Sequence, residues 1–327
     1  MKSRTTILFI LFTAAVAVLF AADIAVGSVS IPIRDVWAAL TGGECDPTTA
    51  RIIRDIRLMK AVVALVAGAA LAVSGLQMQT LFRNPLAGPY VLGVSSGASL
   101  GVALFILGAP MLGLTGHAWL SSLGVAGAAW IGAAATLALV AAISTRIKDI
   151  MVILILGMMI SSGVSAIVQI LQYLSAEEAL KSFVVWTMGS LGDVTATQLA
   201  LLLPAGIAAI KSLNMLLLGE DYARSMGLDL HRSRSIILLS TTLLAGTVTA
   251  FCGPIGFIGL AMPHVARVIF RNADHRTLMP AAALTGAASL LLCDMVAKLL
   301  ALPVNSITAL LGIPVVIWVV VRNRNIV

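Results

Sequence analysis

Long apolar segments separated by short polar ones run through almost the whole chain. Stretches of about 16 to 28 residues, each close to the roughly 20 residues that a helix needs to cross a bilayer, indicate ten spans. They are residues 5–26, 61–82, 90–108, 118–145, 150–174, 198–217, 235–252, 255–270, 279–300 and 304–321. The pattern therefore predicts an all-α, polytopic membrane protein in which residues 1–327 form a single transmembrane domain.

Composition supports this prediction. The chain is 60% hydrophobic and 11% charged with a mean hydropathy of +1.05, whereas soluble domains carry about 25% charged residues. A net charge of +7 would suggest nucleic acid as a partner of a soluble protein. Here the excess of cations on cytoplasmic loops and contact with anionic lipid explain it, so we expect membrane lipid and no nucleic acid as partners. The first apolar run is long enough to span, which favours an uncleaved helix over a signal peptide.

The distribution of basic residues orients the predicted spans. An even number of spans puts both ends on one side, and with cytoplasmic ends 14 of the 21 Lys and Arg residues lie inside and 7 outside. Four of the outer cations fall within residues 51–60. Such a cluster predicts a docking surface for the carboxylates of a soluble partner. The alternative is that these long side chains snorkel at the outer end of the second span.

The segment from Gly68 to Gly101 places polar residues and glycines inside sequence that is apolar enough to span a membrane. Polar groups and broken helices survive at bilayer depth where they line a cavity or are buried in protein, so we expect part of a translocation pathway here and in the fifth span. The candidate wall residues are Gln77, Gln79, Asn84, Pro85, Gly93, Ser95, Ser96 and Gly97. A short inner turn with Lys148, Asp149 and Ile150 is a candidate cytoplasmic gate, and an ordinary tight loop explains it equally well.

Residues 213–235 form the longest polar break between spans on the inner side. Glu220, Ala223 and Gly227 have the spacing of a short helix closed by a glycine, and a second basic turn follows with His231, Arg232 and Arg234. A compact helix-turn-helix would suit rigid docking into a groove of a soluble subunit. A solvated loop of basic topology signals is the alternative.

The sequence lacks the motifs of several classes of enzyme. No G-x-x-x-x-G-K-[ST] occurs, so any ATP hydrolysis must reside on a partner, and neither H-E-x-x-H nor G-x-S-x-G is present. The three cysteines lie far apart, which argues against a metal or redox site. Asp294 stands one turn before Lys298 and predicts an i,i+4 ion pair. We therefore expect a transport subunit with no catalytic residues, no metal and no cofactor of its own.

Two weaker patterns concern the architecture. Ala67, Gly68 and Gly75 match Ala245, Gly246 and Gly253 at a constant offset, which suggests two repeats of inverted topology, although chance matches of glycine explain it as well. Residues 176–194 are too polar at their start to span. They predict a helix along the outer surface whose charged residues face water.

Long stretches of the chain resemble permeases of the FecCD type, the membrane subunits of type II ABC importers for iron-siderophores, haem and cobalamin. The matching pieces are IRLMK, AGAALAVSGLQMQTLFRNPLAGPYVLGVSSGAS, WTMGSLGD, NMLLLGEDYARSMGL, GPIGFIGLAMPHVARVIF, DHRTLMPAAALTGAASLLLCDMVAK and LPVNSITALLGIPVVIW. The resemblance implies ten helices per subunit and a homodimer in the bacterial cytoplasmic (inner) membrane. It also implies two cytoplasmic ATP-binding subunits, which hold ATP and Mg, and an external substrate-binding protein. A ferric chelate or haem is the favoured substrate and cobalamin the alternative. An ion-coupled secondary transporter is a more distant alternative that would need acidic residues within the spans.

The resemblance also assigns roles by position. Arg57, Lys60 and Lys298 match basic sites that receive acidic residues of the binding protein. Residues 220–227, with Glu220, Ala223, Arg224 and Gly227, match the helices that seat on the ATPase. The chain departs from the family pattern at Met59 and Lys60, where Pro-Arg is usual, and at Asn305 and Ser306, where Gly-Val or similar is common. Lysine keeps the charge at position 60 but lacks the two-pronged guanidinium.

Overall fold

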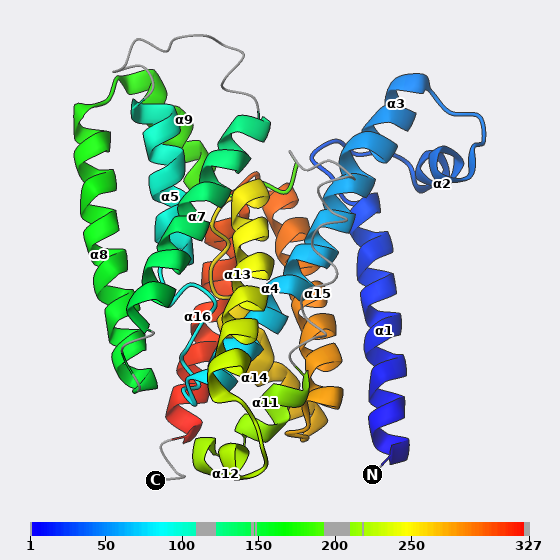
Figure 1. Ribbon diagram of the computed structural model, residues 1–327. Helices are drawn as coiled ribbons and strands as arrows, with labels where there is room; N and C mark the ends of the chain where they lie inside the picture. Colours follow the sequence, from blue (N-terminus) through cyan, green and yellow to red (C-terminus); the bar gives the residue numbers. More distant parts are fainter. Residues whose placement is uncertain are drawn as a thin grey trace. The chain divides into compact units, whose positions relative to one another are not determined.

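The computed structural model describes residues 2–108, 122–144, 147, 149–192, 210–217 and 219–323, and these residues form helices and no strand (Figure 1). The helices divide into two compact units, each assembled from segments of both halves of the sequence. We describe the units separately. Lys148 and most of the predicted span 198–217 lie outside the described residues.

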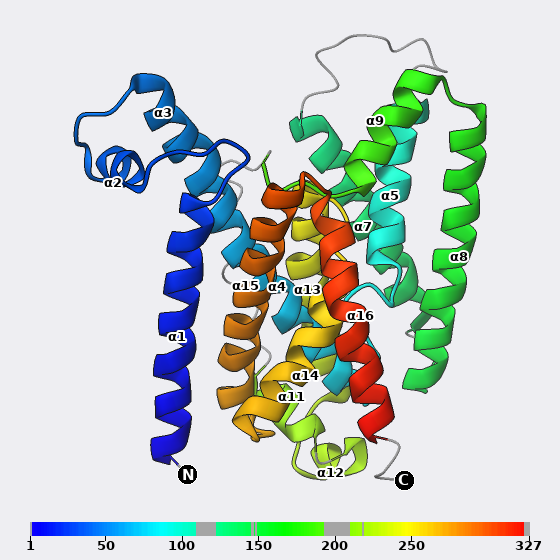
Figure 2. The ribbon, with the colours of Figure 1, turned by 180° about the vertical axis from the view of Figure 1, so that it is seen from behind.

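Unit 1 comprises residues 2–73, 190–192 and 256–323. Its long helices are α1 (Lys2–Ala25), the first part of α4 (Met59–Leu81), α14 (Ile258–Phe270), α15 (His275–Leu300) and α16 (Val304–Asn323). Helix α15 packs against α1, α14 and α16, as Figure 2 shows from behind. In the first half of α1, Phe9 and Phe12 pack against Phe270 with tilted rings, whose centroids lie 4.8 and 5.7 Å from that of Phe270.

The loop after α1 contains two short helices that the apolar pattern did not predict, α2 (Ile33–Thr41) and α3 (Pro47–Arg51). Asp46 caps α3 by accepting the Thr49 N–H at 3.0 Å, and this hydrogen bond lowers the pKa of the Asp46 carboxyl. From α3 the chain continues through a π-helical segment, η1 (Ile52–Leu58), directly into α4. The predicted second span therefore begins inside a longer helical stretch, and η1 buries Ile53 and Arg57.

Unit 2 comprises residues 74–108, 122–144, 147, 149–189, 210–217 and 219–255. It holds the end of α4, then α5 (Val94–Ala103), η2 (Leu104–Gly108), α7 (Ser122–Ser144), α8 (Ile150–Leu174), α9 (Glu177–Thr187), α11 (Ile210–Leu216), α12 (Glu220–Ser225) and α13 (Leu230–Cys252). Helix α5 lies between α7 and α8 and also contacts α9 and α13. The prediction of a helix after residue 176 is confirmed, and Glu177, Glu178 and Lys181 on α9 are exposed.

Small residues let α5 and α7 approach closely. A Cβ atom at Gly97 would overlap the Gly132 carbonyl and the Thr136 side chain, and one at Gly101 would overlap the Ala128 carbonyl. Lipid tails are as apolar as helix side chains, so moving a side chain from lipid to another helix gives no hydrophobic gain. Helices in a membrane therefore associate through close van der Waals packing. Gly97, a predicted wall residue, therefore serves the contact between two helices.

Five described helical stretches are long and apolar enough to cross a membrane, namely Arg4–Ala25, Pro47–Leu81, Met151–Leu174, Leu230–Cys252 and His275–Leu300, and the shorter apolar helices are Val94–Gly108, Gly124–Val140, Ile258–Phe270 and Val304–Val319. Apart from residues 198–217, each predicted span coincides with one of these helices. The count of ten spans and the homodimer stay predictions. So does the inverted repeat, whose paired glycines differ in environment: Gly68 packs on the Gly286 carbonyl, whereas Gly246 has room for a Cβ.

Candidate functional site

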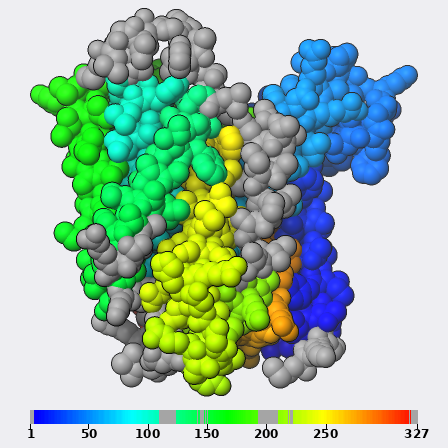
Figure 3. All heavy atoms as spheres, in the orientation of Figure 1, coloured from blue at the N-terminus to red at the C-terminus, as the bar shows by residue number. Residues whose placement is uncertain are grey.

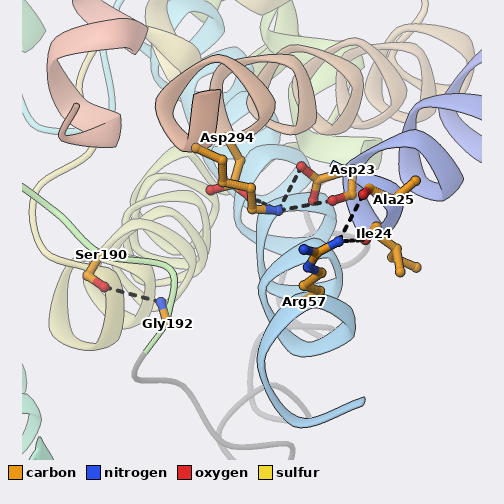
Figure 4. A network of polar contacts seen from close by, with 8 residues as sticks. Asp23, Ile24, Ala25, Arg57, Ser190, Gly192 and Asp294 are labelled. Carbon is orange, nitrogen blue, oxygen red and sulfur yellow. Dashed lines mark hydrogen bonds and ion pairs between the residues drawn. The ribbon is translucent and has the colours of Figure 1, made fainter. Parts of the chain in front are cut away.

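A buried charge cluster joins α1 to α15 in unit 1 (Figure 4). The Lys298 ammonium lies 2.9 Å from Asp23 Oδ1 and 2.6 Å from Asp294 Oδ2, and it also donates to the Asp23 carbonyl at 3.2 Å. The predicted pair of Asp294 and Lys298 is confirmed. Asp23, fully buried at 0% exposure, is a third partner that the sequence did not reveal, because nothing in a pattern of local spacing links residues 275 positions apart.

Arg57 binds the end of the same helix. Its guanidinium donates to the carbonyls of Ile24 at 3.3 Å and Ala25 at 2.8 Å, and also to the carbonyl of Val29. The last carbonyls of a helix have no partner within it and carry partial negative charge. A cation there donates the missing hydrogen bonds and balances that charge. Arg57 is only 4% exposed. Two of the predicted docking cations thus contact consecutive residues at the end of α1.

Lys60 differs from Arg57 and Lys298. Its side chain is half-buried, and among the described residues its ammonium forms no hydrogen bond or ion pair. The backbone of Gly192 lies against its aliphatic stem, since a Cβ at Gly192 would stand 2.8 Å from Lys60 Cε. Nearby in the sequence, Arg51 and Arg54 are exposed. Lys60 is therefore a predicted docking cation whose charge is available to an incoming carboxylate.

Gln77 and Gln79, both predicted in the pathway wall, are buried in unit 2. The Gln77 amide donates to Ser240 Oγ at 3.0 Å and accepts from Thr241 Oγ1 at 2.8 Å, so both ends of the amide are satisfied by α13. A buried polar side chain of this kind holds two helices together because breaking either bond leaves an unsatisfied group in an apolar surrounding. In this structure Gln77 fastens α4 to α13 and does not face open space.

The chain between α4 and α5 forms a turn built from predicted wall residues. Asn84 Oδ1 accepts the Leu86 N–H at 2.9 Å, with Pro85 between them. Gly93, at φ +81°, takes the left-handed conformation that precedes α5, where a side chain would be strained. Ser95 and Ser96 follow in the first turn of α5, and both line a cavity of about 260 Å³ in unit 2.

The predicted coupling element is a helix-turn-helix. Helix α12 ends in a Schellman motif, in which Leu228 N–H donates to Ala223 at 3.0 Å and Gly227 N–H donates to Arg224 at 3.0 Å. Gly227 has φ +84°, as such a cap requires. Asp229 then caps α13 by accepting the Arg232 N–H at 3.0 Å. The predicted helix starting at Glu220 and its closing glycine are therefore confirmed, with a turn of few residues before the next helix.

The side chains that the structure describes on α12, and that of its C-cap residue Met226, differ in burial. Ala223 is fully buried and anchors the helix, whereas Tyr222, Arg224 and Met226 are exposed. Figure 3 shows this segment, in yellow-green, at the surface. Aromatic residues, arginine and methionine are enriched at protein interfaces, so these exposed side chains on a capped helix suit contact with another protein.

The predicted gate is described only in part. Asp149 caps α8 by accepting the Met151 N–H at 2.8 Å, and Ile150 is the first residue of that helix. Lys148 lies outside the described residues. The described geometry is that of an ordinary helix start, which leaves the gate a prediction.

Asn305, one of the departures from the expected pattern, has a clear contact in unit 1. Its side-chain oxygen accepts the Gly256 N–H at 3.0 Å and thereby ties the start of α16 to the loop before α14. The next residue in that loop, Phe257, has φ +65°. Its ring fits against Gly312, where a Cβ would collide with it. The sequence signalled this site only as an unusual residue.

No described residues form a metal site: within the described ranges, no three His, Cys, Asp or Glu side chains come together. Cys252 and Cys293 are buried free thiols, and Cys45 is a half-buried one.

Comparison with known proteins identifies a family and several relatives that match this chain over most of its length. The profile of the FecCD transport family matches residues 14–322. The chain is 37% identical to the hemin transport system permease protein HmuU of Yersinia pestis over 91% of its length and 90% of that protein. It is 38% identical to the vitamin B12 import system permease protein BtuC of Salmonella typhi, covering 82% and 83% of the two chains. It is 35% identical to the molybdate import system permease protein MolB of Haemophilus influenzae, covering 88% and 86%. A solved metal-chelate type ABC transporter in an inward-facing conformation superposes with a TM-score of 0.81 at 31% identity, covering 97% of this chain and 99% of that one.

Proposed function

Because the chain belongs to the FecCD transport family, a family of permease subunits of type II ABC importers, we propose that it carries a metal chelate across the bacterial inner membrane. The cargo in this proposal is an iron-siderophore or haem, delivered by an external binding protein and driven by ATP hydrolysis on two partner subunits. The permease itself forms a homodimer around one central pathway. Family members work with ATPase and substrate-binding partners, and this chain has no nucleotide-binding motif of its own.

The observation that carries the proposal is the capped helix α12. A transport subunit that does not hydrolyse ATP itself must receive the movement of the ATPase through a rigid contact. Helix α12 suits this role because it is closed at Gly227 and anchored by buried Ala223. In the proposal, Tyr222, Arg224 and Met226 enter a groove on the ATPase. Closure of the two ATPases then moves α12 and, through Asp229, the α13 helix that follows.

The proposed docking of the binding protein uses Lys60, whose ammonium has no partner among the described residues, with Arg51 and Arg54 adding steering charge. Exposed cations accelerate encounter with an acidic partner, and their effect weakens with salt. Arg57 and Lys298 belong to the same basic set, but their charges hold the end of α1. We assign them to shaping the docking surface, with Lys60 as the direct contact.

The proposed pathway wall comes from residues 76–101, apart from Gln77 and Gly97, which join neighbouring helices, and from α8. Helix α8 exposes much of its length in the isolated subunit, including Met158, Met159, Gln169 and Tyr173. A membrane helix that exposes Gln169 and Ser165 has a polar face that lipid would not accept, and the second copy of the homodimer or the pathway would cover it.

The experiment is co-purification and transport. Arg224→Glu should reduce the amount of ATPase that co-purifies with the permease and the ATP-driven uptake of chelate into proteoliposomes. Lys181→Glu, on exposed α9, is the matched charge reversal outside the contact and should change neither. Equal co-purification and uptake for both variants would remove α12 from the proposal.

Cobalamin is the alternative cargo within the same family. A second mechanism, coupling to an ion gradient, is favoured by one observation: Asp23 and Asp294 are buried within helices long enough to span. Buried acids in spans are common carriers of protons or cations. Uptake that persists without ATP and collapses with the ion gradient would support this second mechanism.

A further inference from the structure

A polar cavity lies among α5, α8 and α9 of unit 2. Its volume is about 260 Å³, and it is lined by three serines of α5, by Ser165 and two glutamines of α8, and by Phe183 and Thr187 of α9. We call it the serine–glutamine cavity after six of its side chains: Ser95, Ser96, Ser99, Ser165, Gln169 and Gln172. Ser165 and Gln169 are exposed, so the cavity opens along α8.

The six side chains have no hydrogen-bond partner among the described residues. Serines elsewhere on the same helices behave differently. Ser161 donates to the Gly157 carbonyl at 2.8 Å and Ser182 to the Glu178 carbonyl at 3.0 Å. Serine in a helix usually satisfies itself in this way. Unpartnered polar groups gathered at one cavity in a membrane protein cost free energy unless water or a ligand meets them.

The chemistry of the lining selects the kind of ligand. Hydroxyls and primary amides both donate and accept hydrogen bonds, so the cavity can match carbonyl, amide and hydroxyl groups alike. Buried Val168 and Phe183 supply an apolar surface beside them. Within the part of the chain that the structure describes, none of the lining residues is charged. An anion entering here would lose its hydration without meeting a cation, which disfavours carboxylates and oxyanions.

We propose that the serine–glutamine cavity binds an uncharged hydrogen-bonding group of the transported chelate, such as an amide, a hydroxyl or a metal-bound carbonyl. The inference rests on the proposed function and narrows it, since it favours chelates whose periphery is neutral over those that present free carboxylates. The cavity is smaller than a whole chelate. It therefore receives one edge of the cargo.

A labelling experiment tests occupancy directly. The permease, assembled with its ATPase and binding protein in proteoliposomes, carries Ser165→Cys on a Cys45→Ser background, which removes the half-buried native thiol. The probe is an uncharged ferric trihydroxamate. During ATP-driven uptake, this probe should slow reaction of the new thiol with a neutral maleimide at least fivefold. Labelling of Ser182→Cys, exposed on α9 and outside the cavity, should not change.

A transport experiment tests the contribution of the hydrogen bonds. Gln169→Leu combined with Gln172→Leu removes two amides from the cavity and should lower the rate of trihydroxamate uptake about tenfold, since each lost hydrogen bond typically costs a few-fold in affinity. Ser182→Ala is the control and should transport at the original rate. Gln169→Arg should shift preference toward ferric citrate, whose free carboxylates would then find a cation.

The outcomes separate the inference from the proposed function. Uptake that proceeds with unchanged Ser165→Cys labelling and unchanged rates in the double variant would show that the cargo does not enter the cavity, which overturns the inference and leaves the importer intact. Preference of the original protein for ferric citrate over the trihydroxamate also overturns it. Absence of ATP-driven uptake of every chelate would overturn the proposed function and this inference with it.

Discussion

Lys298 of α15 and Asp23 of α1 form an ion pair with 2.9 Å between Nζ and Oδ1, across 275 positions of sequence. The pair is buried, and Asp294 shares the same ammonium. Removing one member of a buried ion pair leaves an uncompensated charge, which costs far more than the pair contributes as a whole. This relationship makes Lys298 a residue that stabilises the fold of unit 1, whatever it does at the surface.

Replacing Lys298 with Met should destabilise the protein by about 3–5 kcal/mol, because two buried carboxylates lose their shared cation. Thermal unfolding in detergent measures the effect. Adding Asp23→Asn and Asp294→Asn should restore much of the loss, since the uncompensated charges disappear with them. Lys181→Met, an exposed lysine on α9, is the control and should cost less than about 0.5 kcal/mol. A Lys298→Met protein as stable as this control would show that the ion pair is not formed.

Replacing Arg57 with Lys should loosen the end of α1, because one ammonium cannot reach the carbonyls of Ile24, Ala25 and Val29 together. We expect a loss of about 1.5–3 kcal/mol, the range for hydrogen bonds to charged groups. Amide hydrogen exchange should become faster from residue 23 to residue 29. Arg51→Lys, at an exposed position nearby, should leave exchange unchanged, and identical exchange in both variants would contradict the cap.

Gly132→Ala and Gly127→Ala make a matched pair on α7. A Cβ at Gly132 would overlap the backbone of Gly97 on α5, whereas one at Gly127 meets nothing within 4 Å. Gly132→Ala should cost about 1–3 kcal/mol by overpacking. Gly127→Ala should be neutral or stabilise by up to about 1 kcal/mol, because alanine favours the helix. Equal unfolding temperatures for the two variants would mean that α5 and α7 do not pack as described.

Gly227→Ala should weaken the coupling element by about 1–2 kcal/mol, since a residue with a Cβ is strained at φ +84°. The readout is the amount of ATPase that co-purifies and its stimulation by a loaded binding protein. Gly227→Asn should recover part of both, because asparagine tolerates the left-handed conformation better than alanine. Full activity of the alanine variant would show that the cap at α12 is not needed for coupling.

Local signals in the sequence predicted much of this structure. The length of the apolar runs predicted the long helices, and the spacing from Glu220 to Gly227 predicted a capped helix because both depend on neighbouring residues. The pair of Asp294 and Lys298 was predictable for the same reason. Asp23 was not, because its partners are brought to it only by the packing of α1 against α15.

In the candidate site, too, some features follow from neighbouring residues and others depend on how the helices pack. Polar residues within apolar sequence mark positions that need a partner, but the sequence does not say whether the partner is protein or cargo. Gln77 and Ser96 were predicted alike as wall residues. In the structure Gln77 is satisfied by Ser240 and Thr241, whereas Ser96 lines a cavity and has no hydrogen-bond partner among the described residues. Only the packing of the helices distinguishes the two.

The most direct test of the central claim compares proteoliposomes that contain this chain alone with proteoliposomes that also contain the ATPase and a loaded binding protein. We predict uptake of a ferric chelate only in the complete assembly, in the presence of hydrolysable ATP, and no uptake by the chain alone under any ion gradient. Sustained uphill uptake by the chain alone, driven by a proton or sodium gradient, would contradict it and would turn attention to Asp23 and Asp294 as coupling acids.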